Sequence, residues 1–368
     1  MKMELPPSRY RALPLQVIDV DGGVILKRGL VEVRVVGRGA AGAVRTLLEA
    51  ASGAGIAEGD VGALFAGAER SGAEALLRRL IERRFLVEEP GAAPGAAAGD
   101  PRPEEDPAAV FYWHFGEGRA EVAARVAGRR VVIVGVNRIS RQLARSLRDS
   151  GISSFDVRDD PLLRNGSFFD DAGALRPSAW PAELGAPIAH GGGVHATDPG
   201  SFGCLVATAE LGGMQLLRPW NEHCVLHRRL FLPVLLEDMI GHVGPLVVPG
   251  ETACFECFRL RRSTHEADPW ARRAIEAASS GGRPAAGSLP PMASVLGDVA
   301  AVELLKLLGL HPPVGELGAA VEVNLLASDM TARRVLRLPR CPVCTPLSER
   351  PTLAATKSAA AARSRGAA

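Results

Sequence analysis

Six cysteines are the residues of this sequence whose type and spacing point most directly to chemistry. Four of them form two Cys-x-x-Cys pairs, Cys254/Cys257 and Cys341/Cys344, and residues 258–340 separate the pairs. Two such pairs supply the four thiolates of a tetrahedral zinc site, which can join segments that lie far apart in the sequence. Because four protein thiolates leave no open coordination position, we expect a structural Zn²⁺ rather than a catalytic one.

The alternative for these pairs is two unrelated dithiols, either redox-active or simply free. The N-terminal sequence has no apolar segment of the kind found in secretory signals, so we expect a cytoplasmic protein, in which lasting disulfides are rare. The metal site is therefore the favoured interpretation. The other two cysteines, Cys204 and Cys224, have apolar neighbours and are interpreted as buried thiols, with thioester formation as the alternative.

A second candidate site follows an apolar run at Val131–Val136, which predicts a strand buried in a parallel sheet. A helix and the strand SFDVRDD come next, an order that places a nucleotide-type crevice at Gly135 with Asp159 near the ribose position. Asn137 and Ser140 stand where a phosphate-binding loop needs glycines. We therefore expect a vestigial crevice on a Rossmann-type scaffold that has lost productive nucleotide binding.

The elements that position these residues indicate two domains of α/β class. Residues 1–89 combine a hairpin around Asp21-Gly22-Gly23, a third strand at 31–36 and three helical patterns, which predicts a winged-helix-like domain. Residues 108–345 alternate strands with helices, which predicts a doubly wound parallel sheet. In this second domain we expect strands at 131–136, 204–210, 231–238 and 244–249, and helices at 106–127, 138–150 and 289–309.

Two segments are too poor in large apolar side chains to fold by themselves. Residues 90–107 are rich in proline, glycine, alanine and acidic residues, and they are predicted to form a linker. Residues 346–368 are predicted to form a disordered tail.

Length and charge exclude several classes of protein. The chain has 368 residues, and 43 basic residues stand against 41 acidic ones, so no strongly basic face suggests nucleic acid as a partner. No apolar run approaches the roughly 18 residues that a membrane span needs, so no membrane partner is expected. Lysine is absent between Lys27 and Lys306, which removes any chemistry that needs a lysine in the middle of the chain.

Over about 110–345, a Rossmann-type strand–turn–helix is followed by GPLVVPGETACFECF, then by LGDVAAVELLKLL, and then by PRCPVC. This order of motifs resembles the ThiF-like adenylating enzymes, relatives of the ubiquitin-activating enzymes. The resemblance implies a glycine-rich loop, a lysine on the polyphosphate and an aspartate for magnesium. In this sequence the loop is broken, the lysine is missing and Glu210 is the nearest counterpart of the aspartate. These departures argue against adenylation.

A subset of that family accounts for the losses. Together with its N-terminal domain the chain resembles the C proteins, or ocin-ThiF-like proteins, in which a PqqD-like winged helix precedes a ThiF-like scaffold that has lost adenylation. The resemblance implies a non-catalytic component that binds the leader of a ribosomal precursor peptide, with no use of ATP by this chain. It recruits that peptide to a separate YcaO-family cyclodehydratase, which makes thiazoline and oxazoline rings, and it activates this partner.

Two other functions stay open. The chain could be an active ATP-dependent adenylating enzyme that acts on a peptide carboxyl terminus, or a nicotinamide-dependent oxidoreductase on the same scaffold. Related scaffolds pair as homodimers, so we expect a dimer.

The peptide site is predicted along the strand at 31–36. An edge strand offers unpaired backbone groups, so that a leader peptide can add to it as a further strand. Arginines on the helix at 72–84 can pair with leader carboxylates. The expected contact residues lie on this strand and this helix: Val31, Val33, Val35, Leu76, Arg79, Leu80 and Arg83.

Overall fold

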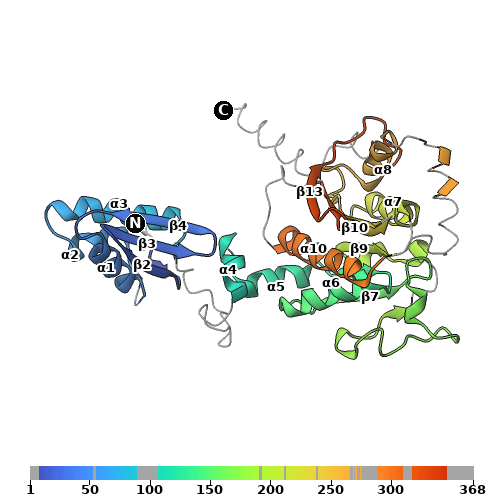
Figure 1. Ribbon diagram of the computed structural model, residues 1–368, viewed down its shortest axis with the longest axis horizontal. Coiled ribbons are helices and arrows are strands. Elements are labelled where there is room, and N and C mark those ends of the chain that lie inside the picture. The colour runs from blue at the N-terminus through green and yellow to red at the C-terminus, as the bar shows by residue number, and fades with distance from the viewer. Residues whose placement is uncertain are drawn as a thin grey trace, which may run out of the picture. The chain divides into compact units, whose positions relative to one another are not determined.

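The computed structural model divides the chain into two compact units, Met1–Glu121 and Val122–Ala368, which we describe separately (Figure 1). The residues that the structure describes are 8–52, 55–88, 107–115, 117–189, 193–210, 213–237, 239–265, 268, 270–271, 274–275, 288–309 and 317–345. The predicted tail at 346–368 lies outside them, and so does the predicted linker at 90–107 apart from Pro107.

The first unit contains a three-stranded antiparallel sheet in the order β2-β3-β4 (Figure 1). The two turns that join these strands each use a glycine with positive φ, Gly22 at 75° and Gly29 at 55°, because glycine adopts this conformation without strain. The predicted hairpin and third strand are therefore present. The strands are β2 (Gln16–Val20), β3 (Gly23–Arg28) and β4 (Val31–Val36).

Helices and a smaller sheet complete this unit. The helices are α1 (Ala40–Ser52), η1 (Glu58–Asp60), α2 (Val61–Leu64) and α3 (Ala68–Glu82). The short strand β5 (Leu86–Glu88) pairs with β1 (Tyr10–Ala12) in a separate two-stranded sheet. Apolar faces of α1, α3 and the three-stranded sheet form a single core, in which Val24, Leu47 and Leu77 are fully buried.

The helix predicted over 106–127 is broken into α4 (Pro107–His114) and α5 (Arg119–Gly128). Within the first unit, Trp113 of α4 lies under the Arg28 guanidinium, whose central carbon is 4.4 Å from the ring centroid. Tyr112 and Trp113 are buried. The first unit thus includes α4, whereas the sequence suggested a second domain from residue 108 onwards.

The second unit is built on an eight-stranded sheet in the order β13-β12-β11-β10-β9-β6-β7-β8. Five strands from β10 to β8 are parallel, and the remaining three are antiparallel. This is the doubly wound arrangement expected, and the chain reverses its direction of progress between β6 and β9. The strands are β6 (Val131–Val134), β7 (Phe155–Asp159), β8 (Ile188–Ala189), β9 (Cys204–Ala209), β10 (Leu230–Glu237), β11 (Ile240–Val243), β12 (Ala319–Asn324) and β13 (Asp329–Arg334).

The strand predicted at 244–249 was wrong. The chain instead forms β11 immediately before it, and only Val247 makes an isolated bridge to Phe231. Pro245 and Pro249 lack a backbone N–H, and Gly244 has a φ of 87°, so this segment cannot continue a strand ladder.

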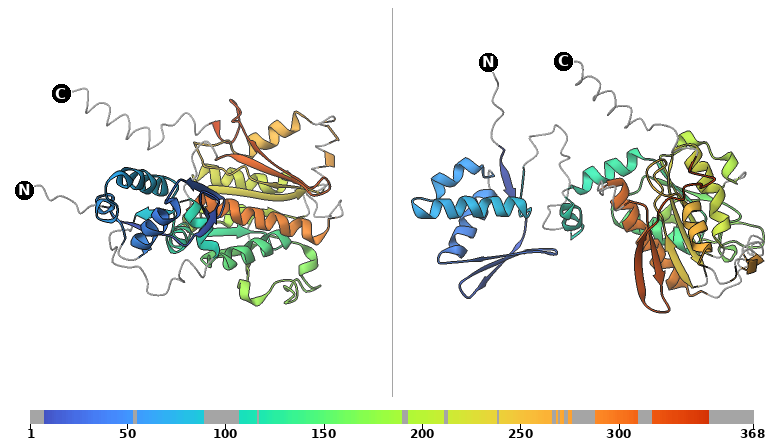
Figure 2. Two further views of the ribbon diagram at one scale, coloured as in Figure 1. Left: turned by 60° about the vertical axis from the view of Figure 1, so that its left-hand side comes forward. Right: turned by 90° about the horizontal axis from the view of Figure 1, so that it is seen from above.

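Helices cover both faces of the sheet (Figures 1 and 2). Alternate residues of β6, such as Val132 and Val134, share a core with α7 (Arg218–Leu226) and α8 (Phe255–Ser263). The other face is covered by α6 (Arg138–Asp149) and α10 (Pro290–Gly309), which lie side by side. They meet closely at Gly297, where a Cβ atom would lie 2.7 Å from the Ile139 carbonyl oxygen.

Short 3₁₀ turns connect these elements: η2 (Gly166–Phe168), η3 (Ala182–Leu184), η4 (Gly193–Ala196), η5 (Pro199–Ser201) and η6 (Met214–Leu217). Among the described residues, no helix is both long enough and apolar enough for a membrane crossing.

Candidate functional site

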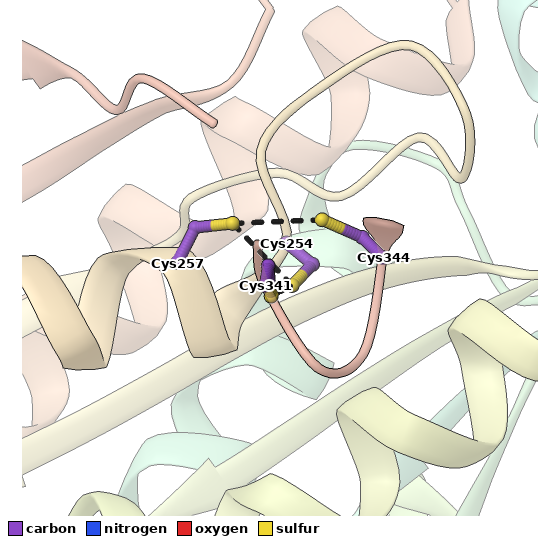
Figure 3. A group of neighbouring side chains, drawn as sticks. All are labelled: Cys254, Cys257, Cys341 and Cys344. Atoms are coloured by element: carbon purple, nitrogen blue, oxygen red, sulfur yellow. Dashed lines mark hydrogen bonds between the residues drawn. The ribbon is translucent and has the colours of Figure 1, made fainter. Parts of the chain in front are cut away.

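The four paired cysteines meet in one cluster, although they come from distant segments (Figure 3). Cys254 precedes the first turn of α8, Cys257 lies in that turn, and the second pair follows β13. The Sγ atoms of Cys254 and Cys341 are 3.6 Å apart, and those of Cys257 and Cys344 are 3.5 Å apart. All four ligand atoms lie within 4.8 Å of one another and are buried.

This geometry fits a tetrahedral metal ion. Zn–S bonds of about 2.3 Å give a tetrahedron whose sulfur–sulfur edges are about 3.8 Å. The Cys254–Cys257 separation is 3.8 Å, far beyond a disulfide bond of about 2.05 Å. Hydrogen bonds from Cys254 and Cys257 lower the pKa of the Cys344 thiol, while the bond to Cys257 raises the pKa of Cys254. Four buried sulfurs could therefore hold one metal ion, and they would leave it no open position.

Ion pairs to the buried Glu256 side chain stabilise the cysteine cluster. Glu256, between the first two cysteines, receives two hydrogen bonds from Arg259 at 2.9 and 2.8 Å. Its carboxylate also lies 3.6 Å from Arg218 at the start of α7. The Phe255 amide donates to Asn221 of α7 at 3.0 Å. These contacts fix the start of α8, and with it the first cysteine pair, against α7.

The remaining two cysteines are buried in the core. Cys204 on β9 and Cys224 on α7 have no exposed surface, and burial raises the pKa of Cys204 to about 12. A thioester requires an accessible thiolate, so this environment favours the interpretation as buried thiols.

We expect neither of these two thiols to react with iodoacetamide in the folded protein, because both are buried and protonated at neutral pH. Mass spectrometry of the native protein should find both unmodified, whereas the same treatment in denaturant should modify both. Rapid native modification of Cys204 would instead support a thioester role.

The predicted nucleotide crevice lies where the sheet order reverses, at the carboxyl ends of β6 and β9. Gly135 has a φ of 103°, and a Cβ atom there would lie 2.6 Å from the Thr208 carbonyl oxygen. Asn137 caps α6 by accepting a hydrogen bond from the Ser140 amide at 3.0 Å. Its amide nitrogen donates to the carbonyl oxygens of Thr208 and Leu163, at 3.0 and 2.9 Å. The side chain at the phosphate-loop position thus links the start of α6 to β9 and to the segment after β7.

Glu210 places its carboxylate at the amino end of α6, the position where a doubly wound fold binds a phosphate. Only 3% of this residue is exposed. Its oxygens accept hydrogen bonds from the Arg138 amide at 2.9 Å, the Arg138 guanidinium at 2.5 Å and the Asn165 side chain at 2.9 Å. The protein's own carboxylate therefore occupies the helix-terminal anion position.

Asp159, the expected ribose ligand at the end of β7, is also engaged by the chain itself. Arg164 donates to both of its oxygens, at 3.1 and 2.5 Å. Burial raises the pKa of Asp159, and the attraction to Arg164 opposes this shift. The structure thus places all three predicted crevice residues at the same end of the sheet. Arg138 and Asn165 complete the site through their hydrogen bonds to Glu210, and neither was predicted as a site residue.

The predicted peptide edge has a more specific geometry than the sequence indicated. β4 is an edge strand of its sheet, and Val31, Val33 and Val35 turn toward the core. In an antiparallel pair, alternate residues direct both backbone groups to the partner strand. The bond from the Gly37 amide to the Gly22 carbonyl sets this alternation, so the outward backbone groups of β4 belong to residues 32, 34 and 36.

The four contact residues predicted on the helix also divide into two buried and two exposed side chains. Leu80 has no exposed surface, and Leu76 is buried beside it. Arg79 on α3 and Arg83, the residue directly after this helix, are exposed. Val33 and Leu80 are core residues in this structure and offer no surface to a peptide, because side chains on the inner face of a packed element are covered.

Comparisons with known proteins place the fold. No family model matches this sequence, and no curated protein matches it. Among solved structures, E. coli MccB bound to MccA-N7isoASN is similar with a TM-score of 0.65 and 18% identity, over 92% of this chain and 99% of that one. A heterocyclase in complex with substrate and cofactor gives a TM-score of 0.55 and 19% identity, over 92% of this chain. The heterocyclase TruD gives 0.56 and 19%, again over 92%.

These similarities extend through both units, so the chain shares its fold with MccB and with these heterocyclases. The chain spans 40% of the length of the heterocyclase complex and 43% of TruD, but nearly the whole of MccB. At this level of identity the fold is shared, while activities and partners belong to those proteins.

Proposed function

We propose that this chain is the peptide-recruiting component of a heterocycle-forming system on ribosomal peptides. It binds the leader of a precursor peptide and presents the peptide to a separate YcaO-type ATP-dependent cyclodehydratase, which it also activates. The observation that carries this proposal is the crevice of the second unit: in a fold shared with heterocyclases, Glu210 fills the anion position and Arg164 engages Asp159. The helix-terminal anion position and Asp159, which would contact a bound nucleotide, therefore already have partners within the chain.

The peptide binds along the free edge of β4 in the first unit, which serves as the PqqD-like recognition domain. Main-chain hydrogen bonds to residues 32, 34 and 36 give affinity, because an added strand pairs with outward backbone groups whatever its sequence. Two exposed arginines at the end of α3, Arg79 and Arg83, attract acidic leader residues at longer range.

Zn²⁺ is the metal that the four-cysteine cluster holds. Zinc prefers four sulfur ligands at the separations found here, and a closed site of this kind supplies folding free energy rather than Lewis-acid chemistry. Cys254, Cys257, Cys341 and Cys344 join α8 to the segment after β13, so the metal stabilises the second unit.

The test of this proposal is fluorescence polarisation of a labelled leader peptide from a neighbouring short reading frame, titrated with the full chain. We expect saturable micromolar binding. Arg34→Pro should weaken it at least about tenfold, because proline removes an outward N–H and its ring blocks strand addition. The core contacts of β4 remain, since Arg34 is exposed and its N–H points away from β3.

Asp19→Pro is the control, because Asp19 holds the equivalent outward position on β2, the opposite edge of the same sheet. It also removes the ion pair between Asp19 and Arg45, at 2.7 Å, so it is the harsher of the two changes. This variant should bind the leader as the wild type does. Equal losses in both variants would indicate damage to the unit, and no binding by wild type would reject the proposal.

A further inference from the structure

The three-stranded sheet of the first unit has an exposed outer face. Its inner face packs on the core that it shares with α1 and α3, whereas Ile18 and Val36 on the outer face are 43% and 64% exposed. Arg34 lies on the same outer face and is exposed as well. The strand register places Arg34 of β4 directly beside Ile25 of β3, and Ile25 beside Ile18 of β2. The edge strand therefore presents one cation at the border of a largely apolar surface.

Among the charged side chains of β2, β3 and β4, Arg34 is the one without a partner on the residues that the structure describes. Its cross-strand neighbour, Ile25, is apolar and offers it no carboxylate. The other four charged side chains of these strands all have partners: Asp19 pairs with Arg45 at 2.7 Å, Lys27 with Glu32 at 4.0 Å, and Arg28 lies over Trp113.

We infer that Arg34 selects a carboxylate on the outer face of the bound leader peptide. This inference rests on the proposed function, because it concerns a peptide that adds to the edge of β4. In a strand antiparallel to β4, the residue directly opposite Arg34 places its side chain on the same outer face. Opposite charges at such a position favour the pairing, and like charges oppose it.

The position of Arg34 within the strand ladder makes the selection specific to one leader residue. Backbone pairing alone accepts any sequence, and the arginines at the end of α3 lie outside the ladder, so no register ties them to one leader position. The outward backbone groups of residue 34 instead align a single leader residue with Arg34.

The neighbouring outer-face positions of β4 define the rest of the preferred segment. Val36 is apolar, so the leader residue two positions from the carboxylate, on the side of Val36, meets an apolar side chain. Glu32 lies on the other side, and its charge is already matched by Lys27. The outer face thus favours an extended segment with an acidic residue two positions from an apolar one.

A charge swap between protein and peptide tests this inference, by fluorescence polarisation with the full chain and the labelled leader peptide of the neighbouring reading frame. In a set of leader variants, each Asp or Glu is replaced by Lys at one position at a time. Arg34→Glu should bind the native leader at least about fivefold more weakly than wild type does. Wild type should show a similar loss with the Lys variant at the selected position, and Arg34→Glu should restore the affinity for that variant alone.

Arg38→Glu is the matched control, because Arg38 is exposed, follows β4 outside the strand ladder, and undergoes the same change of charge. It should restore binding of none of the Lys variants. Thermal melting should confirm that both protein variants fold. A wild type that binds the leader, with no Lys variant restored by Arg34→Glu, would overturn this inference alone. A wild type that binds no leader would reject the proposed function as well.

Discussion

Serine in place of Cys254 is expected to release the metal from the four-cysteine cluster and to lower the melting temperature of the protein by more than about 10 °C. Structural zinc contributes about 10–16 kcal/mol to the folding of zinc-finger peptides. A loss of only about 5 kcal/mol shifts the melting temperature of a unit this large by about 10–20 °C. The effect is large because the four sulfurs belong to the same buried core as α7 and the central strands.

Metal analysis and thermal melting check this result together. Wild type should contain one zinc per chain, and the Cys254→Ser variant should contain none. Cys224→Ala is the matched control, because it removes a buried thiol from the same core without touching the cluster. It should keep its zinc and lose far less stability. A chelator that strips the metal without changing the melting temperature would contradict a structural role.

The four-cysteine cluster could be predicted from sequence because the information is local and chemical. Each Cys-x-x-Cys pair already places two sulfurs on one turn, and only one additional contact, between the pairs, had to be supplied by the fold. The parallel core strands were equally clear, since Val131–Val134 is apolar throughout and Thr208 is the one polar residue of Cys204–Ala209. The sequence also indicated the helices α6 and α10.

The antiparallel end of the sheet was not predictable in this way. β13 reads DMTARR, which has no apolar alternation, because both of its faces lie outside the helical layers. Its partner β12 and the short β11 follow from tertiary pairing rather than from local pattern. The partners of Glu210 were hidden for a related reason, since Arg138 and Asn165 reach it only after three strand ends have been brought together.

A substitution at Glu210 distinguishes the proposed function from adenylation, because the two functions give this carboxylate different roles. If it is an internal anion that completes the fold, Glu210→Gln leaves Arg138 and Asn165 without a charged partner at a buried site. Breaking a buried ion pair from one side costs about 3–5 kcal/mol, so the melting temperature should fall by about 6–12 °C or more. Wild type should show no stabilisation by Mg-ATP.

If Glu210 instead holds magnesium for an adenylating enzyme, its loss should abolish ATP–pyrophosphate exchange and leave stability nearly unchanged. Each hypothesis predicts a change in a different readout, the melting temperature or the pyrophosphate exchange, so this pair of assays decides between them. Asp171→Asn is the matched control, because it removes one negative charge from an exposed position. It should change neither readout. A three-donor network closed around a carboxylate favours the first outcome, since catalytic carboxylates keep coordination sites open for metal and substrate.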